Sequence, residues 1–299
     1  MAFAALGTAA TLAAGAALTP ATAATPQPQA QAQPLERTQR YVALGDSYAS
    51  GPVIPRQNDL TCLRSNANYP SLIRNELGLT DFRDVTCMGA KTDDMFQQQR
   101  DTRRPPQLDA VDRGTRLVTL SVGGNDIDFA DILKRCTHPF QPVPEGNPCQ
   151  RYFSQRGTDD LDQRINDTAP KVAALLKAIH KKAPRARVAV VGYPAIIGDD
   201  AQACRKSLRV AEGDVPYLRG TLRRLNAMLR QQAVAQGDLY VNTNARTADH
   251  DACRPWNERW IEGIAPVNPW TAAAFHPNAR GEKAMSEAVL DALIFGPRR

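Results

Sequence analysis

Residues 41–51 read YVALGDSYASG, a short apolar run that ends in Gly-Asp-Ser and is followed by small residues. A continuous apolar run, rather than an alternating one, is typical of a strand buried on both faces of a sheet. Ser47 then stands at a strand-to-helix turn, where the backbone amides that follow point outward. A serine in this place is either a turn residue or a nucleophile, and its partners elsewhere in the chain must decide.

Further runs of the same kind predict four more strands, in residues 82–90, 115–126, 186–194 and 239–244. Helical patterns lie between and after them, in residues 68–77, from Thr168 onward, in 215–237 and in 281–296. Strands that alternate with helices predict an α/β protein, a three-layer α/β/α sandwich with a central parallel sheet of about five strands. The segment 135–160, rich in Pro, Gly and Gln, predicts a disulfide-braced surface loop.

The first 35 residues carry no charged side chain and are rich in Ala, Thr, Gly and Pro. We interpret residues 1–25 as a secretory signal with small residues at its cleavage site, although no basic segment precedes the apolar run. Gly, Thr and Pro interrupt that run too early for a membrane anchor. Residues 26–39 predict a disordered Pro/Gln/Ala linker, and residues 40–299 one folded domain. We therefore expect a secreted, extracellular protein.

Six cysteines in a chain with an export signal favour disulfide bonds. Sequential pairing would close three local loops, and it predicts the bonds Cys62–Cys87, Cys136–Cys149 and Cys204–Cys253. A zinc site is the competing interpretation, because His138 lies close to two of these cysteines. No Cys-x-x-Cys pair accompanies it, so we expect no metal.

The chain carries a net charge of +6, and its basic residues are scattered. Scattered charge is typical of a solvated surface rather than of a groove for nucleic acid. We expect no nucleic-acid partner, no stable membrane anchor and a monomer.

The ends of parallel strands meet at one edge of a sheet, so Ser47, Gly89 and residues 123–125 should converge there. A serine hydrolase also needs a base, a group that orients the base and donors for the oxyanion. His276, in AAAFHPNARG directly before the last helix, has the setting of a site residue. The other three histidines, in loops or at a helix end, have settings typical of structural or solvated residues.

Four blocks stand in order along the chain: GDSY, the glycine of CMGA, GGND and HPN. Together they resemble the SGNH subgroup of the GDSL esterase/lipase family, and the chain is most similar to secreted actinomycete SGNH esterases and lipases. The resemblance runs from about Tyr41 to the end and implies the flavodoxin-like SGNH hydrolase fold. It also implies roles for four residues. Ser47 would be the nucleophile and, through its own N–H, an oxyanion donor; Gly89 and Asn125 would be the other donors, and His276 the general base.

Two departures from the family pattern stand out. Tyr48 follows the nucleophile where GDSL has leucine, and Ala273 stands where many members carry an aspartate three residues before the histidine. Residues 263–281 contain no Asp or Glu, so the resemblance favours a Ser–His dyad whose imidazole donates to a main-chain carbonyl. We expect that carbonyl to be the one of Ala273; Asp249 or Asp251 is the less favoured third member.

We therefore expect a secreted serine esterase or lipase that hydrolyses small-molecule or lipid esters through an acyl-enzyme, with no cofactor. An O-acetyl esterase acting on carbohydrate or cell-wall polymer would use the same residues. A secreted binding module that has kept the fold and lost the activity is the alternative outside enzymes.

Overall fold

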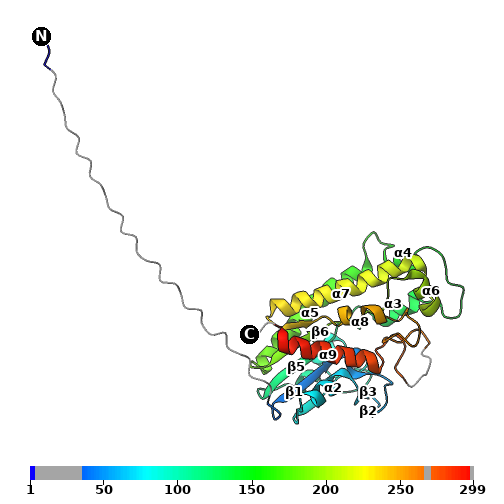
Figure 1. Ribbon diagram of the computed structural model, residues 1–299, viewed down its shortest axis with the longest axis horizontal. Helices are drawn as coiled ribbons and strands as arrows, with labels where there is room; N and C mark the ends of the chain where they lie inside the picture. Colours follow the sequence, from blue (N-terminus) through cyan, green and yellow to red (C-terminus); the bar gives the residue numbers. More distant parts are fainter. Residues whose placement is uncertain (4–35, 266–270, 297–299) are drawn as a thin grey trace. The chain divides into compact units, whose positions relative to one another are not determined.

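This computed structural model describes residues 1–3, 36–265 and 271–296. Apart from residues 1–3, the expected signal segment lies outside the described residues, as does the expected linker up to residue 35. The chain divides into two units, Met1–Gln33 and Pro34–Arg299. The second unit carries the elements described below (Figure 1).

Five parallel strands form the central sheet of this unit, in the order β4 (Phe82–Asp84), β1 (Arg40–Gly45), β5 (Thr115–Ser121), β6 (Arg187–Val191) and β7 (Leu239–Val241). This is the flavodoxin-like order, in which the chain reverses its direction of travel between β1 and β5. The predicted fold class is confirmed. A short antiparallel pair, β2 (Gln57–Asp59) and β3 (Arg64–Ser65), lies outside the sheet.

Both faces of the sheet are buried, which explains the continuous apolar runs. Tyr41 and Ala43 of β1 face a cluster made with α2 (Tyr69–Glu76) and α9 (Ala279–Phe295). Val42 and Leu44 face the larger cluster made with α5 (Asp160–Lys182) and α7 (Val215–Ala235). Figure 1 shows α2 and α9 together on one side of the strands and α5 and α7 on the other.

The remaining helices are short. They are α1 (Ser47–Ser50), α3 (Phe129–Cys136), α4 (Pro148–Phe153), α6 (Ala201–Leu208) and α8 (Thr243–Thr247), with 3-10 turns η1 (Thr92–Met95), η2 (Gln107–Ala110), η3 (Glu212–Asp214) and η4 (Ala248–His250). The segment 135–160 is thus less irregular than predicted, because α4 lies within it.

Helix α5 begins at Asp160, eight residues before the predicted start at Thr168. The side chain of Asp159 caps it by accepting from the amides of Leu161 and Asp162. Leu161 and Ile165 are buried in line with the later apolar residues of the helix. Pro170 lies inside α5, so the prediction that a proline marks the first turn was wrong.

The six cysteines are joined in the predicted pairs, Cys62–Cys87, Cys136–Cys149 and Cys204–Cys253. The second bond connects the end of α3 to α4. The thiols that a zinc ion would need are therefore bonded to each other. Within residues 36–265 and 271–296, no three His, Cys, Asp or Glu side chains gather closely enough to share a metal ion.

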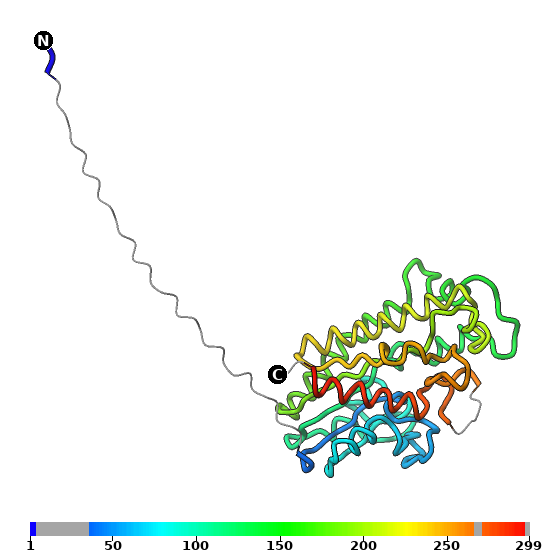
Figure 2. The backbone as a smooth tube through the Cα atoms, viewed as in Figure 1, coloured from blue at the N-terminus to red at the C-terminus, as the bar shows by residue number. Residues whose placement is uncertain are grey.

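The last helix of the unit returns to the first strands. Figure 2 shows the red end of the chain, α9, running beside the blue and cyan segments that contain β1 and α2. This return brings the segment directly before α9, which includes His276, to the residues after β1. No helix in the described part of the chain has the length and apolar character needed to cross a membrane.

Candidate active site

The turn after β1 holds Ser47 at the first position of α1. Asp46 is the N-cap, and its Oδ1 accepts a 2.9 Å hydrogen bond from the amide of Tyr48. Gly45 lies so close to β5 that a Cβ there would sit 2.7 Å from the carbonyl oxygen of Ser121. Ser47 is only 6% exposed, so the turn holds it largely away from solvent.

The imidazole of His276 contacts the serine. Its Nε2 lies 2.8 Å from Ser47 Oγ, and its Nδ1 lies 2.8 Å from the carbonyl oxygen of Ala274. A carbonyl only accepts hydrogen bonds, so Nδ1 carries the proton and Nε2 is the free acceptor. The serine hydroxyl therefore donates to a nitrogen that can take its proton.

The orienting carbonyl belongs to Ala274, so the expectation of Ala273 was wrong by one residue. The carbonyl of Ala273 instead accepts from the backbone N–H of His276, at 3.1 Å. Phe275, between Ala274 and His276, has a φ of +63°, which lies in the left-handed region that a bulky residue rarely adopts. This turn directs the carbonyl of Ala274 toward the ring.

Burial lowers the pKa of His276 to about 4, and the hydrogen bond to Ala274 opposes that shift. Neither aspartate considered as a third member completes a triad. The side chain of Asp249 is 91% exposed beside Arg254. Asp251 is buried, but its carboxylate accepts from the amide of Cys253 and pairs with Arg254.

The two other predicted residues lie on loops tied to the serine turn. The amide of Cys87 donates to the carbonyl of Gly45 at 3.0 Å, which fixes the CMGA loop to the end of β1. Gly89 in that loop is exposed, with φ +78°. The Asn125 side-chain amide donates to Ala90 at 3.0 Å, which fixes the GGND loop to the CMGA loop.

A tyrosine that the sequence analysis did not single out joins the serine turn to the GGND loop. Tyr193 Oη donates to Asp46 Oδ2 at 2.6 Å and accepts from the amide of Gly124 at 2.7 Å. Burial raises the pKa of Asp46 to about 7, against the bonds from Tyr193 and from the Tyr48 amide. The available signal was position alone, since Tyr193 follows the end of β6 as Ser47 follows β1.

The remaining histidines make contacts of a structural kind. His180 on α5 bonds Asp238 at 2.8 Å. His250 stacks on Trp260, with ring centroids 3.6 Å apart. The backbone amide of His138 donates to Arg209. Of the four, His276 is the one in contact with the serine.

Comparison with known proteins identifies the family of the chain. The profile of the GDSL-like Lipase/Acylhydrolase family matches residues 43–284. The chain belongs to this family. It is 41% identical over 263 residues to Lipase 2 of Streptomyces coelicolor (strain ATCC BAA-471 / A3(2) / M145), covering 86% of each chain, and 30% identical over 293 residues to an esterase of Streptomyces scabiei, covering 84% of each.

The fold of this GDSL-family chain also matches a solved relative. The crystal structure of an extracellular lipase from Streptomyces rimosus superposes with a TM-score of 0.66 at 26% identity, covering 85% of this chain and 99% of that one. The GDSL-family chain is thus a carboxylic ester hydrolase, and the resemblance drawn from its four sequence blocks is confirmed.

Proposed function

We propose that this GDSL-family chain cleaves carboxylic esters with a Ser47–His276 dyad through an acyl-enzyme. The observation that carries the proposal is the 2.8 Å contact between Ser47 Oγ and the unprotonated Nε2 of His276. That distance lies within the range required for general-base removal of a proton.

In the first half of the reaction, His276 Nε2 takes the Ser47 proton while Oγ attacks the ester carbonyl. The oxyanion accepts from the backbone N–H groups of Ser47 and Gly89 and from the amide of Asn125. This amide has two N–H groups, and the bond to Ala90 uses one of them. The intermediate collapses when the imidazolium returns its proton to the departing alcohol.

In the second half, His276 takes a proton from water, which attacks the acyl group on Ser47. Collapse of this second intermediate gives the carboxylic acid and returns the proton to Oγ. The carbonyl of Ala274 holds the imidazole in one tautomer throughout, as an aspartate does in a triad, but it brings no negative charge.

An apolar slot beside the GGND loop supports an ester with an apolar acyl group. It is lined by side chains from that loop, α3, α7 and the segment after Tyr193: Ile127, Phe129, Ile132, Leu133, Ile196, Ile197, Leu218, Thr221, Leu222 and Leu225. Phe129 connects it to the site, because its ring centroid lies 6.2 Å from that of Tyr48.

The slot is small, with a volume of about 30 Å³. This small size favours a second candidate, an O-acetyl esterase acting on carbohydrate or cell-wall polymer. A series of p-nitrophenyl esters from acetate to palmitate separates the two. A kcat/KM that peaks at acetate supports the acetylesterase, and one that peaks at longer chains supports the esterase or lipase.

Three disulfide bonds and the charge-free first 35 residues support the proposal that the protein is secreted. We also propose that it acts as a monomer, because both members of the dyad come from one chain. Expression in its host with fractionation tests the first point. Light scattering on the exported protein tests the second.

The dyad is tested with Ser47→Ala and His276→Ala. Each should remove nearly all of the esterase activity above the contribution of oxyanion donors and binding, with an unchanged melting temperature. A fluorophosphonate probe should label the parent and not Ser47→Ala. A parent protein that is folded but neither labelled nor active would indicate the binding module instead.

A further inference from the structure

Tyr48, the residue that replaces leucine in the GDSL pattern, contacts the histidine segment in two ways. Its ring stacks on the imidazole of His276, with centroids 4.9 Å apart and 30° between the planes. Its hydroxyl donates to the carbonyl of Phe275 at 2.7 Å. The side chain is 3% exposed, so both contacts are shielded from water.

The hydroxyl of Tyr48 thus holds the one residue of this segment that has a left-handed backbone. A bulky residue with positive φ persists only where its surroundings enforce it. On its other side, the amide of Phe275 donates to Glu262, and the amide of Glu262 donates to His276. Phe275 is therefore fixed at its amide by the backbone and at its carbonyl by Tyr48.

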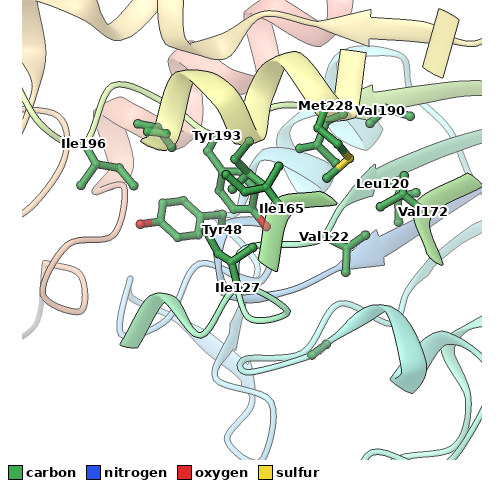
Figure 3. Close-up of a cluster of buried hydrophobic side chains, with 14 of the residues drawn as sticks. Tyr48, Leu120, Val122, Ile127, Ile165, Val172, Val190, Tyr193, Ile196 and Met228 are labelled. Atoms are coloured by element: carbon green, nitrogen blue, oxygen red, sulfur yellow. The ribbon is translucent and has the colours of Figure 1, made fainter. Parts of the chain in front are cut away.

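Tyr193 connects Tyr48 to the serine turn and to the GGND loop. Its ring packs edge-on against Tyr48, with centroids 5.0 Å apart. Figure 3 shows the two tyrosines beside each other. The hydroxyl of Tyr193 bonds Asp46 of the serine turn and the amide of Gly124 of the GGND loop. A Cβ at Gly124 would lie 3.0 Å from the Tyr193 ring, so this loop closes directly onto the tyrosine.

We propose that Tyr48 and Tyr193, the tyrosine pair, are positioning residues that align the base and the oxyanion loop with Ser47. This inference rests on the proposed function. Among the described residues, the imidazole Nδ1 bonds a carbonyl and no carboxylate, and the pair supplies the orientation that a carboxylate gives elsewhere. Tyr48 fixes the base through its ring and through Phe275, and Tyr193 fixes the Asn125 loop through Gly124.

The test compares Tyr48→Phe and Tyr193→Phe with Tyr41→Phe. Tyr41 is also fully buried and bonds Thr119 at 2.8 Å, but it lies near the start of β1, away from the site. Displacing a catalytic group by about 1 Å can cost about 100-fold in rate. We expect kcat to fall about 10- to 100-fold in the first two variants and less than about twofold in Tyr41→Phe, with KM little changed in all three.

Titration of active sites with the fluorophosphonate gives kcat per folded molecule, so a variant that folds in lower yield is still informative. Tyr48→Leu, which restores the family residue, also loses the ring stack and should be slower than Tyr48→Phe. An unchanged kcat in both Phe variants, or a rise in KM alone, would overturn the proposal.

A second measurement does not depend on turnover. In ¹⁵N-labelled protein, the Nδ1 proton of His276 should exchange with solvent faster in Tyr48→Phe than in the parent or in Tyr41→Phe. Equal exchange would refute a role in holding the base, even if the parent hydrolyses esters as proposed. The two proposals can also fail separately. If Ser47→Ala is inactive while both Phe variants keep the parental kcat, the proposed dyad stands and the positioning role of the tyrosine pair is refuted.

Discussion

The lowered pKa of His276, the proposed base, predicts how activity changes when the pH is lowered. Burial lowers the pKa of His276 to about 4, from the 6.5 of an exposed imidazole. The base works only when neutral, and a lowered pKa keeps it neutral further into acid. At pH 5 about 90% of a base with pKa 4 is neutral, against about 3% of one with pKa 6.5. The enzyme should thus be about 30-fold more active at pH 5 than an exposed histidine would allow.

The assay is kcat/KM for a soluble short-chain ester between pH 3 and 8 at constant ionic strength, since this ratio reports the free enzyme. Returning each sample to pH 7 and recovering full activity excludes acid unfolding. Asp46 also has a shifted pKa, at about 7, so Asp46→Asn serves as the control. If the fall in kcat/KM near pH 4 persists in this variant, it belongs to His276. An acid limb near pH 6.5 in both proteins would refute the argument from burial.

Four further outcomes follow from the structure. Asn125→Ala should lower kcat about 100- to 1,000-fold, measured at saturating ester, with little change in melting temperature because the side chain is only half-buried. Folding raises the pKa of Asp46 from its usual 3.8 to about 7, so its contribution to stability is complete below pH 3.8 and is lost as the pH rises through 7. In urea titrations over that pH range, the free energy of unfolding of the parent should therefore fall relative to that of Asp46→Asn. Replacing both Cys204 and Cys253 by serine opens a loop with a sequence separation of 49, which should lower the free energy of unfolding by about 4 kcal/mol in denaturant. Asp249→Ala should keep kcat within about twofold, and a large loss would revive the distant triad.

The strands could be predicted because their signals are local, and the four site blocks because their order along the chain resembles the family pattern. Residues 115–126 carry a continuous apolar run and then two glycines, and both the strand and the turn follow from that pattern. The carboxyl ends of parallel strands lie at one edge of a sheet, so the sequence predicts that Ser47 and Asn125 lie together.

The errors arose where a contact between distant residues overrides the local pattern. Pro170 is typical of a first turn, but the cap by Asp159 and the burial of Leu161 start α5 a full two turns earlier. The carbonyl that accepts from the imidazole is that of Ala274 rather than the predicted Ala273, because Phe275 takes a left-handed φ, which no rule for phenylalanine predicts. The second partner of Asp46, Tyr193, lies 147 residues away in sequence, and only the folded sheet brings the two together.

Gly45 limits what can be changed at the centre of this enzyme. Any side chain there would meet the Ser121 carbonyl at 2.7 Å and the Ala49 side chain at 2.9 Å. To make room, β1 would have to move away from β5. Ser47, the proposed nucleophile, follows the end of β1, and the GGND loop, which carries a proposed oxyanion donor, follows the end of β5. The spacing between β1 and β5 at this point therefore requires a residue without a Cβ at position 45. Saturation mutagenesis selected for turnover should leave this codon unchanged even where its neighbours vary.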